Sequence, residues 1–193
     1  MDNREDMENG LEPVDFKSEI FDWLEALVSA LTVIILLFTF FIRLIGVDGN
    51  SMYPTLHHGD QLIVSHMFYS KPKAGDIVVL TKKSFLSDPI VKRVIATEGQ
   101  TVDINFDTHE VMVDGEIVNE PFINEPTSNP INMTFPQTVP ENCVFVMGDN
   151  RNHSSDSRDT RLGMVDSRYI IGRALVRIFP FNRAGLFFSA DLG

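Results

Sequence analysis

The sequence predicts a mostly β fold, in which a domain of many short strands follows one N-terminal transmembrane helix. Three observations indicate this. One long apolar run lies near the N-terminus, short β-branched runs alternate with turn residues after it, and one turn carries an Asp-Gly pair. A chain of 193 residues has room for one membrane segment and one domain of ordinary size.

The apolar run extends from Trp23 to Ile42, and its one charge, Glu25, lies near its start. Twenty helical residues at a rise of about 1.5 Å span about 30 Å, the thickness of the hydrocarbon core of a bilayer. A cleaved signal peptide would have a shorter apolar stretch, a basic flank and a small-residue cleavage site, and a buried helix is the other alternative. We predict a membrane anchor over residues 23–45.

Residues 1–22 are predicted to form an acidic tail. Residues 1–25 carry −7 of the total net charge of −11, which is typical of a solvated terminus and disfavours docking on anionic lipid. No basic patch indicates nucleic-acid binding. Because Lys17 and Arg43 flank the anchor almost symmetrically, charge alone does not fix its orientation.

Residues 46–193 are predicted to form one β-rich domain, either a barrel or a pair of packed sheets. The expected strands are short apolar runs between turn residues, at 61–64, 76–80, 90–96, 101–106, 111–113, 116–118, 144–147 and 170–179. Asp114-Gly115 separates two of them and predicts a two-residue hairpin turn. Segment 119–141 holds five of the ten prolines, which predicts an extended surface excursion.

The first candidate for chemistry is Ser51, in the stretch from Gly49 to Leu56. Glycine permits unusual dihedrals, and Pro54 restricts both its own φ and the residue before it, so this stretch can hold one hydroxyl rigidly at a strand end. Ser51 follows Arg43 by eight residues, which span at most about 26 Å, so we expect it near the membrane surface. A serine is inert, however, until a base removes its proton.

Lys92 is the candidate base. Period-two alternation places it on one face of a strand with Ile90 and Val94, while Arg93 lies on the other face. A free lysine has a pKa of about 10.4, so about one in 2,500 is neutral at pH 7. Burial lowers that pKa and would make the amine a general base. A surface lysine with a solvated ammonium is the alternative, and Lys92 alone does not decide between them.

Segment 147–158 places short polar side chains, two acids and two arginines directly behind an apolar strand. It suits a hydrogen-bonded network that orients the groups of another site. The alternative is a polar turn whose exposed ion pairs contribute about 0–1 kcal/mol each.

The histidines His57, His58 and His153 suggest a Ser-His-Asp triad or a metal site, but their spacing fits no metal motif. We therefore expect solvated histidines and no metal. The single cysteine, Cys143, excludes an internal disulfide and is expected to be a small buried thiol.

Four blocks carry a resemblance to a known family: SMYPTL at 51–56, GDIVVL at 75–80, VKRVIATEGQ at 91–100 and MGDNRNHSSDSR at 147–158. In this order they resemble a bacterial type I signal peptidase. The resemblance covers nearly everything from Gly49 to Phe181. It implies a membrane-anchored β-rich catalytic domain that needs no cofactor and lies outside the cell membrane, with a cytoplasmic N-terminus. The implied substrates are secreted preproteins with small residues at positions −1 and −3.

The resemblance also implies residue roles. Ser51 would be the nucleophile and Lys92 the general base, and Ser154 would hydrogen-bond the lysine. Four charged residues would stiffen the site: Asp149, Asp156, Arg93 and Arg158. The Ser51 N–H would be one oxyanion donor. Some members carry a hydroxyl residue two positions before the nucleophile; this chain has Gly49 there, so the second donor is unidentified.

We expect the cleavage segment of a preprotein to add as a strand to an exposed sheet edge. The residues expected to bind it are Met52, Pro89, Ile90 and Val91. Shallow apolar pockets on that edge would explain a preference for alanine-sized side chains. Membrane lipid is the other expected partner.

Three alternatives to this function remain. Self-cleaving repressor-like peptidases share the dyad but normally carry a DNA-binding module, which the anchor replaces here. A catalytically dispensable relative would assist the assembly of surface fibres such as pili, although this chain retains both Ser51 and Lys92. A plain membrane-tethered β-domain would leave the four sequence blocks unexplained.

Overall fold

The computed structural model describes residues 16–65 and 71–193. Most of the predicted acidic tail lies outside this part of the chain. The chain divides into two compact units, of which the first ends at Phe40 and the second runs from Phe41 to Gly193. The two units are described separately below.

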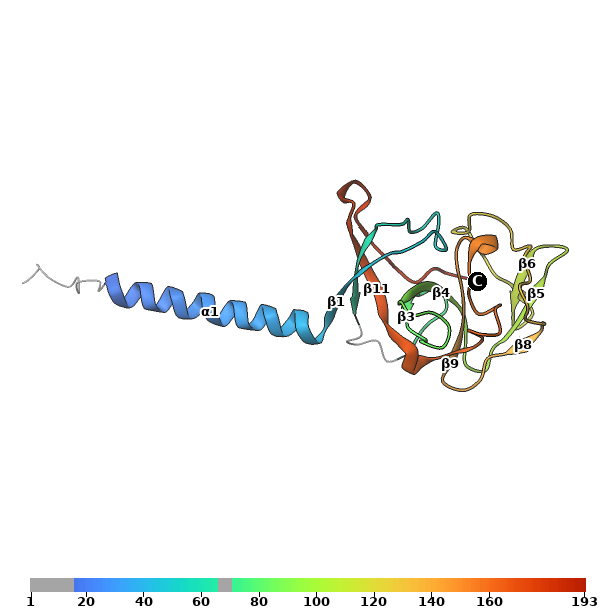
Figure 1. Cartoon of the computed structure of the whole chain (residues 1–193), viewed down its shortest axis with the longest axis horizontal. Coiled ribbons are helices and arrows are strands. Elements are labelled where there is room, and N and C mark those ends of the chain that lie inside the picture. Colours follow the sequence, from blue (N-terminus) through green and yellow to red (C-terminus); the bar gives the residue numbers. More distant parts are fainter. Residues whose placement is uncertain (1–15, 66–70) are drawn as a thin grey trace, which may run out of the picture. The chain divides into compact units, whose positions relative to one another are not determined.

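The first unit contains helix α1, which extends from Phe16 to Phe40 (Figure 1). Its sequence has neither glycine nor proline, and Leu is its commonest residue, so nothing interrupts the backbone hydrogen bonds. The segment Glu19–Thr39 has a mean hydropathy of 2.1 over 21 residues, and among the described residues it is the one helix long and apolar enough to cross a membrane. The helix begins before the predicted range 23–45. It also ends before residue 45, because Ile42 already belongs to a strand.

A large antiparallel sheet of eight strands forms most of the second unit. In spatial order seven of the strands run β1-β2-β11-β3-β4-β9-β10, and the eighth, β12, pairs with β11. The bounds are β1 (Ile42–Gly46), β2 (Gln61–Ser65), β3 (Ile77–Leu80), β4 (Ile90–Thr97), β9 (Cys143–Met147), β10 (Val165–Asp166), β11 (Ile170–Phe179) and β12 (Gly185–Leu186).

A second sheet of four antiparallel strands has the order β7-β6-β5-β8. Its strands are β5 (Thr101–Asn105), β6 (Glu110–Val113), β7 (Glu116–Ile117) and β8 (Gln137–Thr138). Asp114 and Gly115 connect β6 to β7 with φ values of 53° and 87°. Positive φ at both positions is what a two-residue hairpin turn of this kind requires, so the predicted hairpin is confirmed. In residues 41–65 and 71–193 three short 3₁₀ helices are also present, at Arg151–His153, Ser167–Tyr169 and Phe181–Arg183.

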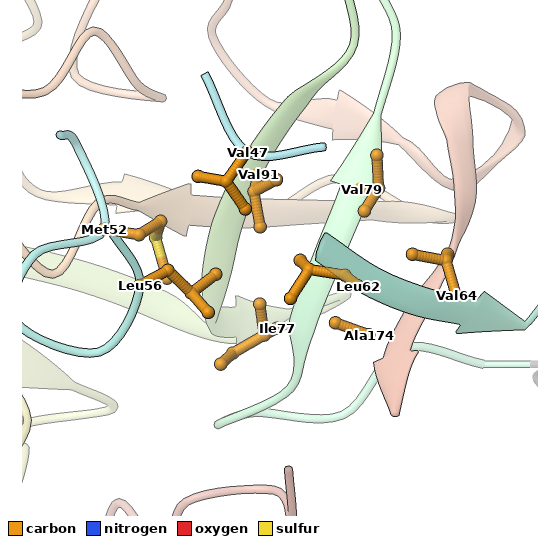
Figure 2. Close-up of a cluster of buried hydrophobic side chains, with 9 residues drawn as sticks. All are labelled: Val47, Met52, Leu56, Leu62, Val64, Ile77, Val79, Val91 and Ala174. Atoms are coloured by element: carbon orange, nitrogen blue, oxygen red, sulfur yellow. The ribbon is translucent and has the colours of Figure 1, made fainter. Parts of the chain in front are cut away.

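The large sheet has buried side chains on both faces. On β3, Ile77 and Val79 belong to one cluster and Val78 and Leu80 to another, as alternation along a strand requires. Figure 2 shows the first cluster, formed by Val47, Met52, Leu56, Leu62, Val64, Ile77, Val79, Val91 and Ala174. A third cluster includes Val102 and Ile104 of β5 together with Phe145 of β9, and it joins the two sheets.

The predicted fold class, mostly β with one N-terminal apolar helix, is confirmed, and a strand is present at each of the eight expected places. The four additional strands β1, β8, β10 and β12 were not predicted. Segment 119–141 is not purely a surface excursion, because Thr127 and Val139 are fully buried and β8 lies within it. Single anchoring residues of this kind leave no periodic pattern in a sequence.

Candidate active site

Two side chains that are 41 positions apart in the sequence meet at the centre of the candidate site. Ser51 lies in the turn segment between β1 and β2, and Lys92 lies on β4. The distance between Lys92 Nζ and Ser51 Oγ is 2.6 Å. Ser51 is in a turn and not at a strand end as predicted, but the structure brings the two residues together as expected.

Burial makes Lys92 unusual among the lysines. The residue is 3% exposed, and burial lowers the pKa of its amine from 10.5 to about 8, although the charges of Asp156 and Asp149 act in the opposite direction. With that pKa, about one molecule in ten carries a neutral lysine at pH 7. The alternative of a solvated surface lysine is therefore wrong.

Arg93, the neighbour of Lys92, is held by a carboxylate. Its guanidinium donates to both oxygens of Asp149, with Nε–Oδ1 and Nη2–Oδ2 distances of 2.8 and 2.7 Å. Thr55 Oγ1 donates to the same carboxylate at 2.5 Å, and the ring of Phe122 lies 3.9 Å from the guanidinium carbon. Asp149 thereby connects strand β4 to the segment that carries Ser51.

A second carboxylate–arginine pair lies within segment 147–158. Asp156 accepts from Arg158 Nε and Nη2, each at 2.9 Å, and from the backbone N–H of Gly148 at 3.1 Å. Both side chains are fully buried. Burial alone would raise the pKa of Asp156, but the hydrogen bonds and charge of Arg158 hold that pKa below its usual value. This carboxylate is therefore ionised at neutral pH.

Gly148 is the point of closest approach between this segment and the nucleophile. A Cβ atom at this position would lie 2.4 Å from the Ser51 carbonyl oxygen and 2.3 Å from Ser154 Oγ. No side chain fits such a space, so the approach requires glycine. Ser154 is 9% exposed.

One predicted contact is missing from this arrangement. Lys92 Nζ donates to Ser51 Oγ and to the Val91 carbonyl, and within residues 16–65 and 71–193 no hydrogen bond joins it to Ser154. The hydrogen bond expected between Ser154 and Lys92 is therefore absent from this structure, although Ser154 lies beside Gly148.

The backbone of Ser51 is fixed from the same segment. Asn150 N donates to the Ser51 carbonyl at 3.0 Å, and the side-chain amide of Asn150 donates to the carbonyl of Asn50 at 3.1 Å. The Ser51 N–H has no acceptor within the described chain. It is therefore available as a donor to a substrate oxygen.

The residues expected to bind substrate occupy different environments. Met52 is 1% exposed and packs with Leu56 in the first cluster, so its side chain belongs to the core (Figure 2). Val91 is also buried in that cluster, Ile90 is half-buried, and Pro89 is exposed. Strand β4 pairs with β9 only from Arg93 onward. Among the described strand pairings, its first three residues, Ile90 to Lys92, therefore have a partner on the β3 side alone.

Sequence reasoning missed several residues of the site. Thr55, Asn150 and Arg151 lie inside the quoted blocks, and their small or charged polar side chains next to the assigned residues were the available signal. Glu120 and Phe122 lie in the proline-rich segment, where nothing in the sequence pattern distinguishes them.

The histidines do not form the triad considered from the sequence. His58 Nδ1 accepts from Gly49 N at 3.3 Å and lies 3.1 Å from Asp48 Oδ1. The expectation of solvated histidines is wrong for His57, whose Nδ1 is buried and has no hydrogen-bond partner within the described chain.

The buried carboxylate of Asp60 contacts Arg177 and Arg183, at 3.2 and 3.0 Å, and no histidine ring. Within the described ranges no group of three or more His, Cys, Asp or Glu residues could hold a metal ion. Cys143 is half-buried at the start of β9, and burial raises the pKa of its thiol.

A serine hydroxyl in contact with a buried amine of lowered pKa is the arrangement of a hydrolase that uses an activated serine. Comparison with known proteins agrees with this class. Residues 20–179 match the family described as signal peptidase, peptidase S26. A signal peptidase I from Bacillus licheniformis is 35% identical over 86% of this chain and 92% of its own length. Signal peptidase I S from Bacillus subtilis is 34% identical over 89% of this chain and 95% of its own.

A probable signal peptidase I from a Synechocystis species is 38% identical over 82% of each chain. A crystal structure of a signal peptidase I from Enterococcus faecalis is 27% identical and covers 54% of this chain and 97% of its own, with a TM-score of 0.43. The family assignment depends on the sequence matches and not on that structure. The chain belongs to the signal peptidase family, peptidase S26, and is a peptidase that removes signal peptides.

Proposed function

We propose that the chain is a membrane-anchored serine endopeptidase that cleaves secreted preproteins after small residues at positions −1 and −3. Ser51 is the nucleophile and Lys92 the general base. The observation that carries the proposal is the 2.6 Å distance between Ser51 Oγ and Lys92 Nζ, within a site where the lysine is 3% exposed.

Acylation begins with the neutral form of Lys92. As Ser51 Oγ attacks the scissile carbonyl carbon, its proton passes to Lys92 Nζ, and the carbonyl oxygen becomes an oxyanion. The Ser51 N–H supports this charge, since no acceptor within the described chain competes for it. When the C–N bond breaks, the proton on Lys92 passes to the departing amine, and the acyl group remains on Ser51.

Deacylation reverses the roles. Lys92, neutral again, takes a proton from a water molecule that attacks the ester carbon. The ester C–O bond then breaks, the proton passes to Ser51 Oγ, and the free enzyme is restored. Each step uses only residues of this chain and water.

The substrate segment adds to the open stretch of β4. Residues Ile90–Lys92 have no strand on the side away from β3 among the described pairings, so an extended peptide can bond to this edge directly beside Lys92. Met52 and Val91 are buried in the first cluster beside this edge, and apolar side chains there support a preference for small apolar residues. The buried side chain of Met52 supports this edge from the core and does not move to contact the substrate.

Helix α1 supports membrane anchoring, since its apolar side chains are exposed in this structure. We place the N-terminus in the cytoplasm and the domain from residue 46 onward outside the cell membrane. Protease added to intact cells should degrade the domain and spare the acidic tail; the reverse pattern would contradict this orientation.

The decisive experiment incubates the full-length protein in detergent with a test preprotein and sequences the new N-terminus of the product. Wild type should cut once, after a small residue, and Ser51→Ala should show no cleavage. Ser167→Ala, which removes an exposed hydroxyl bonded to Asn142 at the far edge of the large sheet, is the matched control and should cut normally. An active Ser51→Ala protein would refute the assigned nucleophile. A wild type without activity would favour the non-catalytic role in fibre assembly.

A further inference from the structure

A buried arginine outside the Ser51–Lys92 pair anchors the segment next to the nucleophile. Arg151 is 1% exposed. Its Nε donates to the carbonyl of Gly148 at 3.0 Å, and its Nη1 donates to Thr127 Oγ1 at 3.0 Å. Its Nη2 lies 2.6 Å from Glu120 Oε1. The guanidinium therefore connects the turn at Gly148 to the proline-rich segment.

Glu120 is the anion that pairs with this arginine. In the described part of the chain, Arg151 has no other ion pair. The carboxylate side chain of Glu120 is itself 9% exposed. Removing one member of such a pair leaves a buried charge without compensation, and the backbone around it then rearranges.

That rearrangement would reach the nucleophile through two contacts. Gly148 packs against the Ser51 carbonyl so closely that a Cβ atom would lie 2.4 Å from it. Asn150 N donates to the same carbonyl at 3.0 Å. A displacement of residues 148–150 therefore moves the peptide unit of Ser51, and with it both the hydroxyl and the N–H that faces the substrate.

We propose that Glu120 is a positioning residue: through Arg151 and Gly148 it sets the backbone position of Ser51 and so controls the rate of the chemical step. This inference rests on the proposed function, because it requires Ser51 to be the nucleophile. It assigns a role to a residue 28 positions from Gly148, in a segment that contains none of the catalytic groups.

Other contacts hold the proline-rich segment in place when Glu120 is changed. Asn124 N donates to the carbonyl of Asp149 at 3.0 Å, and the backbone N–H groups of Ser128 and Asn129 both donate to Asn152 Oδ1 at 3.0 Å. A variant at Glu120 therefore tests the pair with Arg151 and not the attachment of the whole segment.

The experiment measures kcat and KM for cleavage of a test preprotein by the full-length protein in detergent. Glu120→Ala should lower kcat by about 10-fold or more and leave KM within about 3-fold, because geometry and not binding is changed. Glu120→Gln also removes the charge but keeps a polar oxygen at the position that lies 2.6 Å from Arg151 Nη2. It should therefore lose less than Glu120→Ala and retain at least about a third of the wild-type kcat. The double variant Glu120→Ala/Arg151→Met should be no slower than Arg151→Met alone, since the two residues act as a unit.

The control for a general loss of stability is Val111→Ala. This substitution removes a buried side chain of β6 in the cluster that joins the sheets and touches neither Glu120 nor Arg151 in any described ion pair or hydrogen bond. A positioning role predicts that Glu120→Ala loses far more kcat than Val111→Ala at a comparable loss of unfolding temperature. If Glu120→Ala does not fold, the double variant Glu120→Gln/Arg151→Met is measured in its place. Neither of its two new side chains is charged, and its kcat should fall by the same factor.

Three results would overturn the inference: a kcat within about twofold of wild type for Glu120→Ala, an equal loss for Glu120→Gln and Glu120→Ala, or the same loss for the Val111→Ala control. Ser51→Ala is measured in the same series. If Ser51→Ala is inactive and Glu120→Ala is normal, only the positioning role fails; if Ser51→Ala is active, the proposed function itself fails.

Discussion

Lys92 and Arg93 are neighbours on β4 with side chains on opposite faces, and the protein treats their charges in opposite ways. Arg93 is bound through two nitrogens by the carboxylate of Asp149 at 2.7 and 2.8 Å. Lys92 contacts a hydroxyl at 2.6 Å and a backbone carbonyl at 3.1 Å. No carboxylate lies within 4.0 Å of Lys92 Nζ in the part of the chain that the structure describes.

The difference shows how the site obtains a neutral amine. Two buried acids, Asp149 and Asp156, lie near Lys92, but each is bound by its own arginine, Arg93 and Arg158. The lysine therefore receives only their longer-range attraction, which burial outweighs, and its pKa falls to about 8. Binding each carboxylate to an arginine leaves the amine without a permanent counter-ion.

The largest expected effect comes from removing the amine. Lys92→Met should reduce kcat/KM for preprotein cleavage by at least about 1,000-fold, since in residues 16–65 and 71–193 no other base contacts Ser51 Oγ. The same substitution should raise the free energy of unfolding at pH 7 by about 1–3 kcal/mol, because burying the ammonium is unfavourable. Chemical denaturation and cleavage rates measure the two effects. The control Lys71→Met changes an exposed lysine paired with Glu98 and should alter neither; normal cleavage by Lys92→Met would refute the assigned base.

The next largest effect concerns the buried ion pair between Arg93 and Asp149. Asp149→Asn should lower the free energy of unfolding by about 3 kcal/mol, because Arg93 is left buried without a counter-ion. Asp166→Asn is a matched control, since Arg168 binds Asp166 through the same two nitrogens at 3.0 and 2.8 Å, but at the surface. The control should change stability by less than about 1 kcal/mol. Equal losses of unfolding free energy in the two variants would show that burial of the Arg93–Asp149 pair does not increase its contribution to stability.

The third prediction concerns the pH dependence of activity, where the smallest effect is the shift that a substitution causes in its midpoint. Activity should rise with pH through a midpoint of about 8, the pKa of Lys92, and fall about tenfold per unit below it, because only the neutral amine accepts a proton. The Asp156 charge raises that pKa, so Asp156→Asn should move the midpoint to lower pH. Rate profiles between pH 5 and 9 measure both; a flat profile, or a midpoint that moves upward, would contradict the assignment.

The stability contribution of Lys92 has a definite sign. Its pKa in the folded protein, about 8, lies below its ordinary value of 10.5. The burial penalty is therefore fully present below pH 8 and is relieved as the pH rises from 8 toward 10.5. The increase in the free energy of unfolding caused by Lys92→Met should therefore be largest at neutral or lower pH and smallest near pH 10.

Much of the fold was predictable because each expected strand has its own apolar run and turn residues. Strand β1 was not, since Ile42–Ile45 continues the apolar composition of the helix and only pairing with β2 reveals a strand. Two-residue strands such as β10 and β12 depend on their neighbours and carry no periodicity of their own.

The site was predictable to the extent that its residues fall inside the four sequence blocks. Alternation correctly placed Lys92 and Arg93 on opposite faces, but the burial of Lys92 depends on residues from distant segments, and Lys92 alone did not reveal it. Glu120 and Phe122 act through single long-range contacts, with Arg151 and Arg93. Such contacts are set by tertiary packing and leave no trace in local sequence.

If the substrate segment adds to Ile90–Lys92 of β4 as proposed, this open edge also determines what shape of polypeptide can be cut. A backbone that pairs with this edge must present its own N–H and C=O groups sideways, which a helix or a folded domain cannot do while its internal hydrogen bonds persist. A segment must therefore unwind before it can enter, and the mature part of a secreted protein becomes safe from cleavage as soon as it folds.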